Sequence, residues 1–190
     1  TAFYQKYLEI SPTIISGWNS DRFDVPYLYN RSRLLLGDEV ANCLSPIGIV
    51  EFQKYKGTYK IAGVASLDYF RLHKKYSFMQ EPSMKLDFLG EKYVNQKKIE
   101  YDGSLDRLFA EDKQKFIEYN FVDVLILKKL DEKFKYLDLT KNISHKGKCL
   151  YEEVYQSSRT QDGAISAYLL GEDIIPPNKD PNPIIKEDAE

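Results

Sequence analysis

The stretch that decides the fold is GWNSDRFDVPYLYNR, which spans residues 17–31. It overlaps the end of a predicted buried strand, residues 13–18, which begins with β-branched side chains. It then leads into a helical pattern containing Pro26, a residue suited to the first turn of a helix. Asp24 therefore lies where a strand passes through a polar loop into a helix. A carboxylate there can bind a metal ion or act in catalysis, although alone it is more often a helix cap.

The composition fits one medium-sized globular domain with a real core. The chain has 190 residues, 43% hydrophobic and 14% aromatic, and a formal net charge of −2. This charge does not indicate a basic nucleic-acid-binding domain, but a metal-dependent nuclease needs acidic residues at its centre and lysines only along one groove. No apolar run approaches the roughly 20 residues of a membrane span, and no signal peptide is visible. We therefore expect a cytoplasmic protein without a membrane partner.

The apolar periodicity predicts a mixture of helices and strands, which is the α/β or α+β class. A β-hairpin is predicted over residues 49–63 around Lys56-Gly57, and a further strand over residues 64–70. Helices are predicted over residues 3–10, from Pro26 to Gly37, from a cap at Ser83 over residues 86–93, from Gly103-Ser104, from Asp112 to Leu137, and within residues 150–175.

A second candidate carboxylate, Asp123, lies on the long predicted helix. Tyr119 precedes it by four residues, so the phenol and the carboxylate project from the same face. Such a pair can hold water or a metal ion, although i, i+4 pairs of this kind are usually ordinary surface pairs. Hydrolysis of a phosphodiester by two metal ions needs several carboxylates that converge on the ions. Oxygen ligands of this kind favour Mg²⁺ or Mn²⁺ over zinc.

Taken together, the Asn19-x-x-x-Phe23-Asp24 and Tyr119-x-x-x-Asp123 segments resemble the second and third motifs of the DnaQ-like 3′→5′ exonuclease domains of family B DNA polymerases. The likeness is closest to the polymerases of T-even-type bacteriophages and covers most of the chain. It also includes the following short matches: Leu67-Asp68-Tyr69, residues 74–78, Pro82-Ser83-x-x-Leu86-Asp87, Lys98-x-x-Tyr101-Asp102-Gly103, residues 162–165 and residues 174–176.

The resemblance implies an RNase H-like (DnaQ-like) fold with a β-hairpin insertion. It implies that Asp24 and Asp123 are ligands of a two-metal Mg²⁺ or Mn²⁺ site, and that Tyr119 orients the attacking water. Asn19 and Phe23 would contact the frayed 3′ end of the DNA strand. Residues 1–149 would be a partial exonuclease domain, residues 150–175 a segment returning to the rest of the polymerase chain, and residues 176–190 a Pro-rich linker or disordered tail.

The hairpin would help to part primer from template during proofreading. Lys54, Lys56 and Tyr59 suit contacts with a nucleic-acid strand, because ammonium groups bind phosphates and aromatic rings stack on bases. The alternative is a solvated sheet edge with ordinary lysines. We also predict that His73 and His145 are solvated or hydrogen-bonded rather than catalytic, and that Trp18 serves packing more than base stacking.

One departure from the family is the missing first motif. The family carries an Asp-x-Glu sequence on a strand that precedes the second motif, whereas residues 1–13 contain none and Asp188-Ala189-Glu190 lies in the tail. We therefore expect an N-terminally incomplete exonuclease fold, inactive or badly crippled by itself. We also expect an exposed sheet edge that permits dimerisation.

Two alternatives stay open. The chain can be a catalytically dead exonuclease-fold scaffold or DNA-binding module, in which Asp24 and Asp123 are leftovers. It can also be a standalone RNase H-like nuclease with a rearranged site that uses Glu9 or Asp21. Retention of both carboxylates together with Tyr119 favours the polymerase exonuclease.

Overall fold

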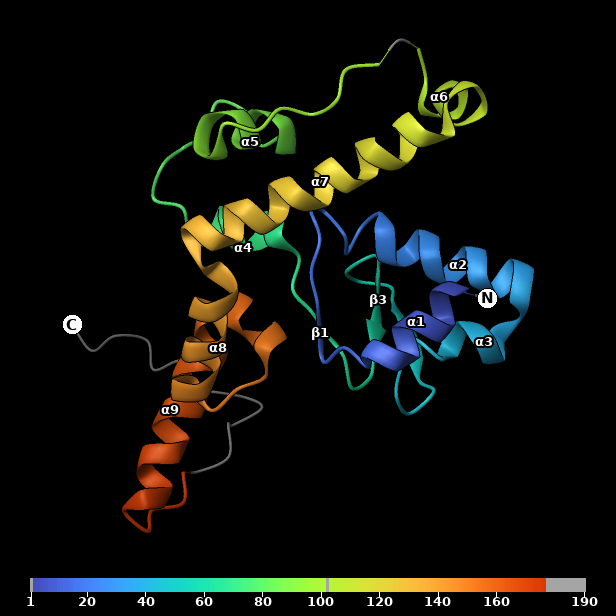
Figure 1. Cartoon of the computed structure of the whole chain (residues 1–190). Coiled ribbons are helices and arrows are strands. Elements are labelled where there is room, and N and C mark those ends of the chain that lie inside the picture. Colours follow the sequence, from blue (N-terminus) through green and yellow to red (C-terminus); the bar gives the residue numbers. More distant parts are fainter. Residues whose placement is uncertain (1, 102, 177–190) are drawn as a thin grey trace, which may run out of the picture. The chain divides into compact units, whose positions relative to one another are not determined.

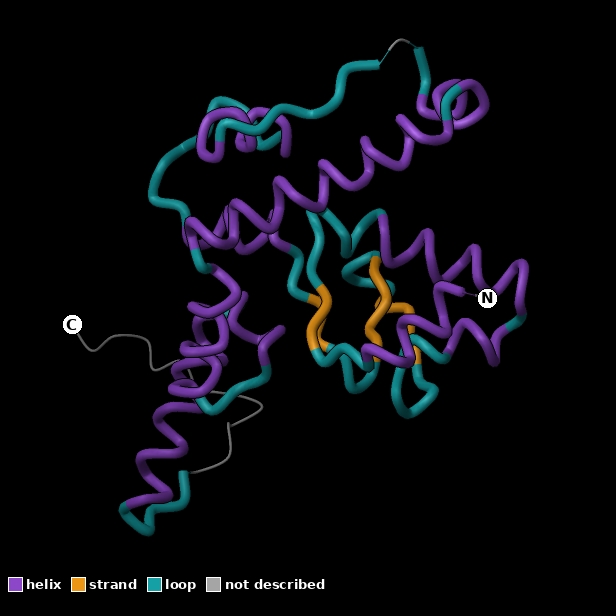
Figure 2. The backbone as a smooth tube through the Cα atoms, in the orientation of Figure 1, coloured by secondary structure: helices purple, strands orange, loops and turns teal. Residues whose placement is uncertain are grey.

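The computed structural model describes residues 2–101 and 103–176. They fall into two compact units, residues 1–142 and 143–190 so far as these are described (Figure 1). The predicted mixture of helices and strands is confirmed, and helices predominate in the tube drawing (Figure 2). None of the helices within the described ranges is long and apolar enough to cross a membrane. The predicted tail lies outside the described residues beyond Pro176.

The first unit combines helices with two short sheets. Its helices are α1 (Ala2–Ile10), α2 (Asp24–Leu36), α3 (Asp38–Asn42), α4 (Tyr69–Tyr76), α5 (Leu86–Val94), α6 (Leu105–Glu111), α7 (Lys113–Phe134) and the first half of α8 (Tyr136–Gly147). Its strands are β1 (Ile14–Ile15), β2 (Val50–Gln53), β3 (Thr58–Ile61) and β4 (Ala65–Ser66). The second unit holds the end of α8, the 3₁₀ helix η1 (Tyr151–Tyr155) and α9 (Ser157–Gly171).

The strand that precedes the loop of interest is shorter than the sequence predicts. β1 pairs in parallel with β4, so that Ile14 lies opposite Ala65, and both residues of β1 are only half-buried. The predicted strand at residues 64–70 is likewise reduced to β4, because Asp68 caps a helix by accepting a hydrogen bond from the Phe70 N–H. Capping thus overrides the β-propensity of the apolar residues that follow.

The hairpin and the helix after the loop follow the sequence closely. β2 and β3 pair antiparallel, so the predicted hairpin is confirmed. α2 begins at Asp24, whose carboxylate complements the positive end of the helix dipole. It ends where Gly37 takes a positive φ of 87° that side chains with a Cβ rarely adopt.

The first unit has a core beneath α2. The cluster consists of buried residues from α1, α2, α3 and the hairpin region: Tyr4, Val25, Tyr29, Ala41, Leu44, Ile61 and Val64. This packing fixes the face of α2 that carries Val25 and Tyr29, and thereby sets the direction in which the first turn of the helix points.

The long helix α7 forms the other wall of this unit and packs against α5 and α6. Asp112 caps it by accepting from the Lys115 N–H, as predicted, and it ends at Phe134 rather than Leu137, because Lys135 takes the left-handed conformation. The predicted cap at Ser83 is wrong, because α5 begins at Leu86 without a side-chain cap. α5 lies close to α7, since a Cβ on Gly90 would lie 2.8 Å from Ile126.

Candidate active site

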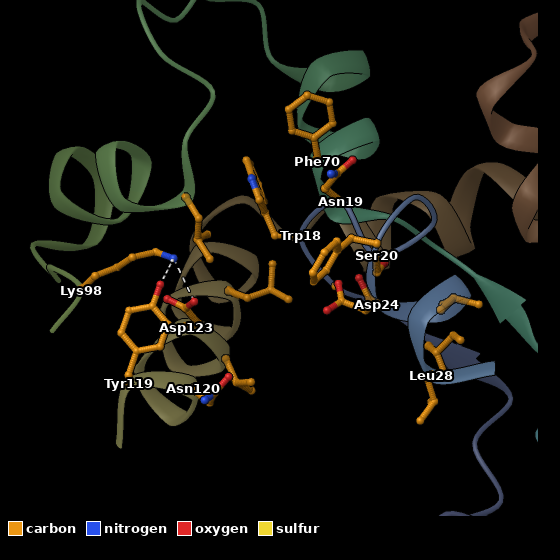
Figure 3. Close-up of a pocket in the computed structure, with 18 of the residues that line it drawn as sticks. Trp18, Asn19, Ser20, Asp24, Leu28, Phe70, Lys98, Tyr119, Asn120 and Asp123 are labelled. Carbon is orange, nitrogen blue, oxygen red and sulfur yellow. Dashed lines mark hydrogen bonds and ion pairs between the residues drawn. The ribbon is translucent and has the colours of Figure 1, made fainter. Parts of the chain in front are cut away.

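The predicted catalytic residues line a single cavity of about 1060 Å³ within the first unit. Asp24 lies on one side, at the start of α2, and Tyr119 and Asp123 lie on the other, on α7 (Figure 3). Asn19 and Phe23 also line the cavity. Residues nearly one hundred positions apart in the sequence are thus brought to one opening of the molecule.

Lys98 joins Tyr119 and Asp123 into one cluster. Its ammonium group donates to the Asp123 carboxylate (Nζ–Oδ2 2.8 Å) and to the Tyr119 hydroxyl (Nζ–Oη 3.2 Å) (Figure 3). Partial burial alone would lower the pKa of Lys98, but these two hydrogen bonds outweigh it, so the pKa is raised and the group stays charged. The cavity therefore has a fixed positive charge beside its carboxylate.

The two carboxylates differ in their surroundings. Asp24 is exposed as a residue, but partial desolvation of its carboxyl group at the cavity raises the pKa, and a hydrogen bond from its own backbone N–H opposes this rise. The second oxygen of Asp123, Oδ1, is buried and has no hydrogen-bond partner. A buried carboxylate oxygen without a partner is costly, so Asp123 presents an acceptor that a bound cation or a hydrogen-bond donor would satisfy.

The donor chemistry of this cavity fits a hard divalent cation in part. Carboxylate oxygens from Asp24 and Asp123 are the ligands that Mg²⁺ and Mn²⁺ prefer. Within residues 2–101 and 103–176, however, no three His, Cys, Asp or Glu side chains gather closely enough to hold a metal ion. Asp24 and Asp123 therefore offer part of a ligand set.

The hairpin residues predicted to contact DNA, Lys54, Lys56 and Tyr59, are not among those that line this cavity. Lys54 and Lys56 are exposed at the turn, and the Lys56 ammonium lies 5.3 Å from the centre of the Tyr55 ring. Tyr59 is held by its neighbours, because its hydroxyl donates to Asn30 and its ring packs 4.5 Å from that of Tyr29. The two lysines are free to meet a ligand, whereas Tyr59 also anchors the hairpin to α2.

The rings of Trp18 and His73 pack together, with their centres 6.1 Å apart. Trp18 also packs against Tyr69 and Phe70 and lines the cavity. The prediction of a solvated or hydrogen-bonded His73 is wrong, because the residue is 1% exposed and neither ring nitrogen has a hydrogen-bond partner. Aromatic rings surround it instead, among them Phe134 and Tyr136.

Sequence reasoning did not single out Lys98. The residue belongs to the Lys98-x-x-Tyr101 segment, but nothing local distinguishes it from the adjacent Lys97. Lys97 pairs with Glu91 at the surface, whereas Lys98 turns to α7. Only the packing of this segment beside α7 shows which lysine belongs to the site.

Comparisons with known proteins agree with this arrangement. Residues 1–89 match the family described as DNA polymerase family B, exonuclease domain. Over these residues the chain belongs to that family. It is 31% identical over 180 residues to the DNA-directed DNA polymerase of Escherichia phage RB69 and 34% identical over 174 residues to that of Enterobacteria phage T4. These alignments cover 92% and 88% of the chain.

The chain spans only part of these relatives, 20% of the RB69 protein and 19% of the T4 protein. A more distant relative is the catalytic polypeptide of DNA polymerase epsilon from Saccharomyces cerevisiae, which is 28% identical over 124 residues. That alignment covers 65% of this chain and 5% of the yeast protein. The phage similarity extends past residue 89, so it includes the region of α7 that carries Tyr119 and Asp123.

Proposed function

We propose that this chain carries part of the 3′→5′ proofreading exonuclease site of a family B DNA polymerase, acting on the 3′ end of DNA. The observation that carries the proposal is the convergence of Asp24 with the Lys98–Tyr119–Asp123 cluster on one cavity. Membership of the family supports the assignment to DNA rather than to another phosphodiester.

Each residue has a role that its position supports. Asp24 and Asp123 would hold the divalent cation, Mg²⁺ or Mn²⁺, which would activate water and stabilise the leaving oxygen. Tyr119 would orient the water through its hydroxyl, and Lys98 keeps that hydroxyl beside Asp123. Asn19 and Phe23, at the edge of the same cavity, would hold the terminal nucleotide. The exposed Lys54 and Lys56 would contact the DNA backbone.

The fold and the partners belong to the same proposal. The parallel pairing of β1 with β4, with the loop to Asp24 following β1, supports an RNase H-like sheet as part of this proposal. The partners would be the frayed primer strand and the rest of a polymerase chain. Besides Asp24 and Asp123, the described residues bring Asp87 to the cavity lining, and one of its oxygens already accepts a hydrogen bond from the Lys98 N–H. Because no three carboxylates gather closely enough to hold a metal ion within the described ranges, we predict weak or no Mg²⁺-dependent digestion of single-stranded DNA by this chain alone.

Binding of Mn²⁺, followed by the electron paramagnetic resonance signal of the free ion, tests the proposal. Asp24→Asn and Asp123→Asn should each weaken binding by at least about tenfold, the lower end of the loss seen when even a supporting group of a metal site is removed. Asp106→Asn, an exposed carboxylate on α6, serves as the control. Equal binding by all four proteins would instead identify an exonuclease-fold scaffold with leftover carboxylates.

A further inference from the structure

The buried carboxylate of Asp68 connects the start of α4 to the loop before Asp24. The residue is 1% exposed. Its Oδ1 accepts hydrogen bonds from the backbone N–H groups of Phe70 and Asn19, both at 3.0 Å, and its Oδ2 accepts one from Asp21 at 3.3 Å. Of these three bonds, the one from Phe70 belongs to helix capping. The other two come from a loop that is 47 and 49 residues away in sequence.

That loop has an irregular conformation. Asn19 has a positive φ of 62°, in the left-handed region that most residues with a side chain avoid but that asparagine tolerates. The turn is so tight that a Cβ on Gly17 would lie 2.7 Å from the Cβ of Ser20. The N–H groups of Asn19 and Asp21, two residues outside any helix or strand, donate to the Asp68 carboxylate.

A second set of bonds holds the same loop through Asp21. Its carboxylate accepts from the hydroxyl of Ser66 at 2.6 Å and from the guanidinium of Arg71 at 3.0 Å, and its carbonyl accepts from the hydroxyl of Thr58 at 2.6 Å. The positive charge of Arg71 offsets the negative charge of the Asp21 carboxylate. β3, β4 and α4 therefore all fix one residue, three positions before Asp24.

We propose that Asp68 is a positioning residue: its carboxylate fixes the loop Asn19–Asp21 and thereby sets where Asn19 and Asp24 stand in the cavity. The consequence for Asp24 rests on the proposed function, whereas the consequence for the loop does not. The competing explanation is that Asp68 merely caps α4. The two explanations can be told apart, because capping of α4 uses the hydrogen bond from Phe70, whereas the loop uses the two hydrogen bonds from Asn19 and Asp21.

The variant Asp68→Ser makes this separation in the full chain. Serine caps helices about as well as aspartate, but it is too short to reach the loop. Amide hydrogen exchange measured by NMR should become about tenfold faster or more at Asn19 and Asp21, as expected when a hydrogen bond to a charged acceptor is lost. Mn²⁺ affinity should fall severalfold. The control is Asp112→Ser on α7, where only a cap is changed and neither quantity should move.

The outcomes decide separately between the two proposals. Unchanged exchange at Asn19 and Asp21 in Asp68→Ser would overturn the positioning role, and so would faster exchange with unaltered Mn²⁺ affinity. Faster loop exchange in a protein whose wild type binds no Mn²⁺ would support the loop role and refute the metal site. If Asp68→Ser does not fold, Asp68→Asn decides. It keeps the acceptor for Asn19 and Phe70 but turns an amide donor towards Asp21, so faster exchange at Asp21 alone supports the proposal and unchanged exchange overturns it.

Discussion

The Lys98–Asp123 pair should stabilise the folded first unit measurably, unlike the surface ion pairs of the chain. We consider the substitution Lys98→Met, which keeps the length of the side chain and removes its charge. Both partners are 27% exposed, and the charged atoms are 2.8 Å apart. At an effective dielectric constant near 20, the gross attraction at this distance is about 6 kcal/mol.

Most of this attraction is offset by the cost of desolvating the two ions. Breaking fully buried pairs costs about 3–5 kcal/mol, and exposed pairs contribute about 0–1 kcal/mol. A pair of intermediate burial should therefore show a coupling free energy of about 1–2 kcal/mol in a double-mutant cycle with Asp123→Asn. The loss of the hydrogen bond from Lys98 to Tyr119 cancels in the cycle, because Lys98→Met removes this bond both in the wild type and in Asp123→Asn.

Urea unfolding followed by fluorescence gives the four free energies of the cycle. Trp18 is the only tryptophan of the chain and lies in the same unit, lining the same cavity. The matched control is the neighbouring pair Lys97–Glu91, whose side chains are 66% and 53% exposed. A coupling for Lys98–Asp123 that is no larger than that of the control pair would show that partial burial does not strengthen this ion pair.

Two further predictions concern stability. Burial lowers the pKa of His73 in the folded chain. As the pH falls through about 6.5, the unfolded chain therefore binds a proton at this histidine that the folded chain does not bind. The unfolding free energy should fall between pH 7.5 and 5.5 by up to about 1.4 kcal/mol per pH unit. In urea titrations, His73→Gln should remove this dependence of the unfolding free energy on pH, whereas His145→Gln, at an exposed position, should keep it. Equal pH dependence in the two variants would contradict the burial argument. In the second unit, a Cβ on Gly163 would lie 2.0 Å from the carbonyl oxygen of Gly147, whereas one on Gly171 meets nothing within 4 Å. Gly163→Ala should therefore destabilise the unit by roughly 1–3 kcal/mol or more and Gly171→Ala should stabilise it by up to about 1 kcal/mol in circular dichroism melts; a stabilising Gly163→Ala would refute the close approach.

The sequence predicts those parts of the fold that depend on local signals. Pro26 and Gly37 bracket α2, Lys56-Gly57 mark the hairpin, and Ser104 and Asp112 cap α6 and α7. These features follow from the conformational limits and hydrogen-bonding capacity of single residues, so most of them form here as predicted, whereas the cap predicted at Ser83 does not. The strand predicted over residues 64–70 is shortened to β4 for a local reason as well, because Asp68 caps α4 within an apolar run.

Only some residues of the candidate site could be predicted from the sequence. The spacing of Tyr119 and Asp123 and the position of Asp24 after a strand indicate which side chains face one way, and they meet at one cavity. The contributions of Lys98 and Asp68 could not be predicted, because each acts on residues tens of positions away. His73 shows the same limit, since only packing reveals that the aromatic rings around it exclude water.

The proposed exonuclease site depends on Asp24 and Asp123 binding a divalent cation in one cavity. Crystals of this chain soaked in Mn²⁺, with anomalous diffraction recorded at the manganese absorption edge, would show this binding. We expect an anomalous peak in the cavity within about 2.0–2.6 Å of carboxylate oxygens, the range of hard-cation bonds, lost in Asp24→Asn and Asp123→Asn crystals. Peaks that touch neither carboxylate, or a cavity without one at saturating Mn²⁺, would contradict the proposed site.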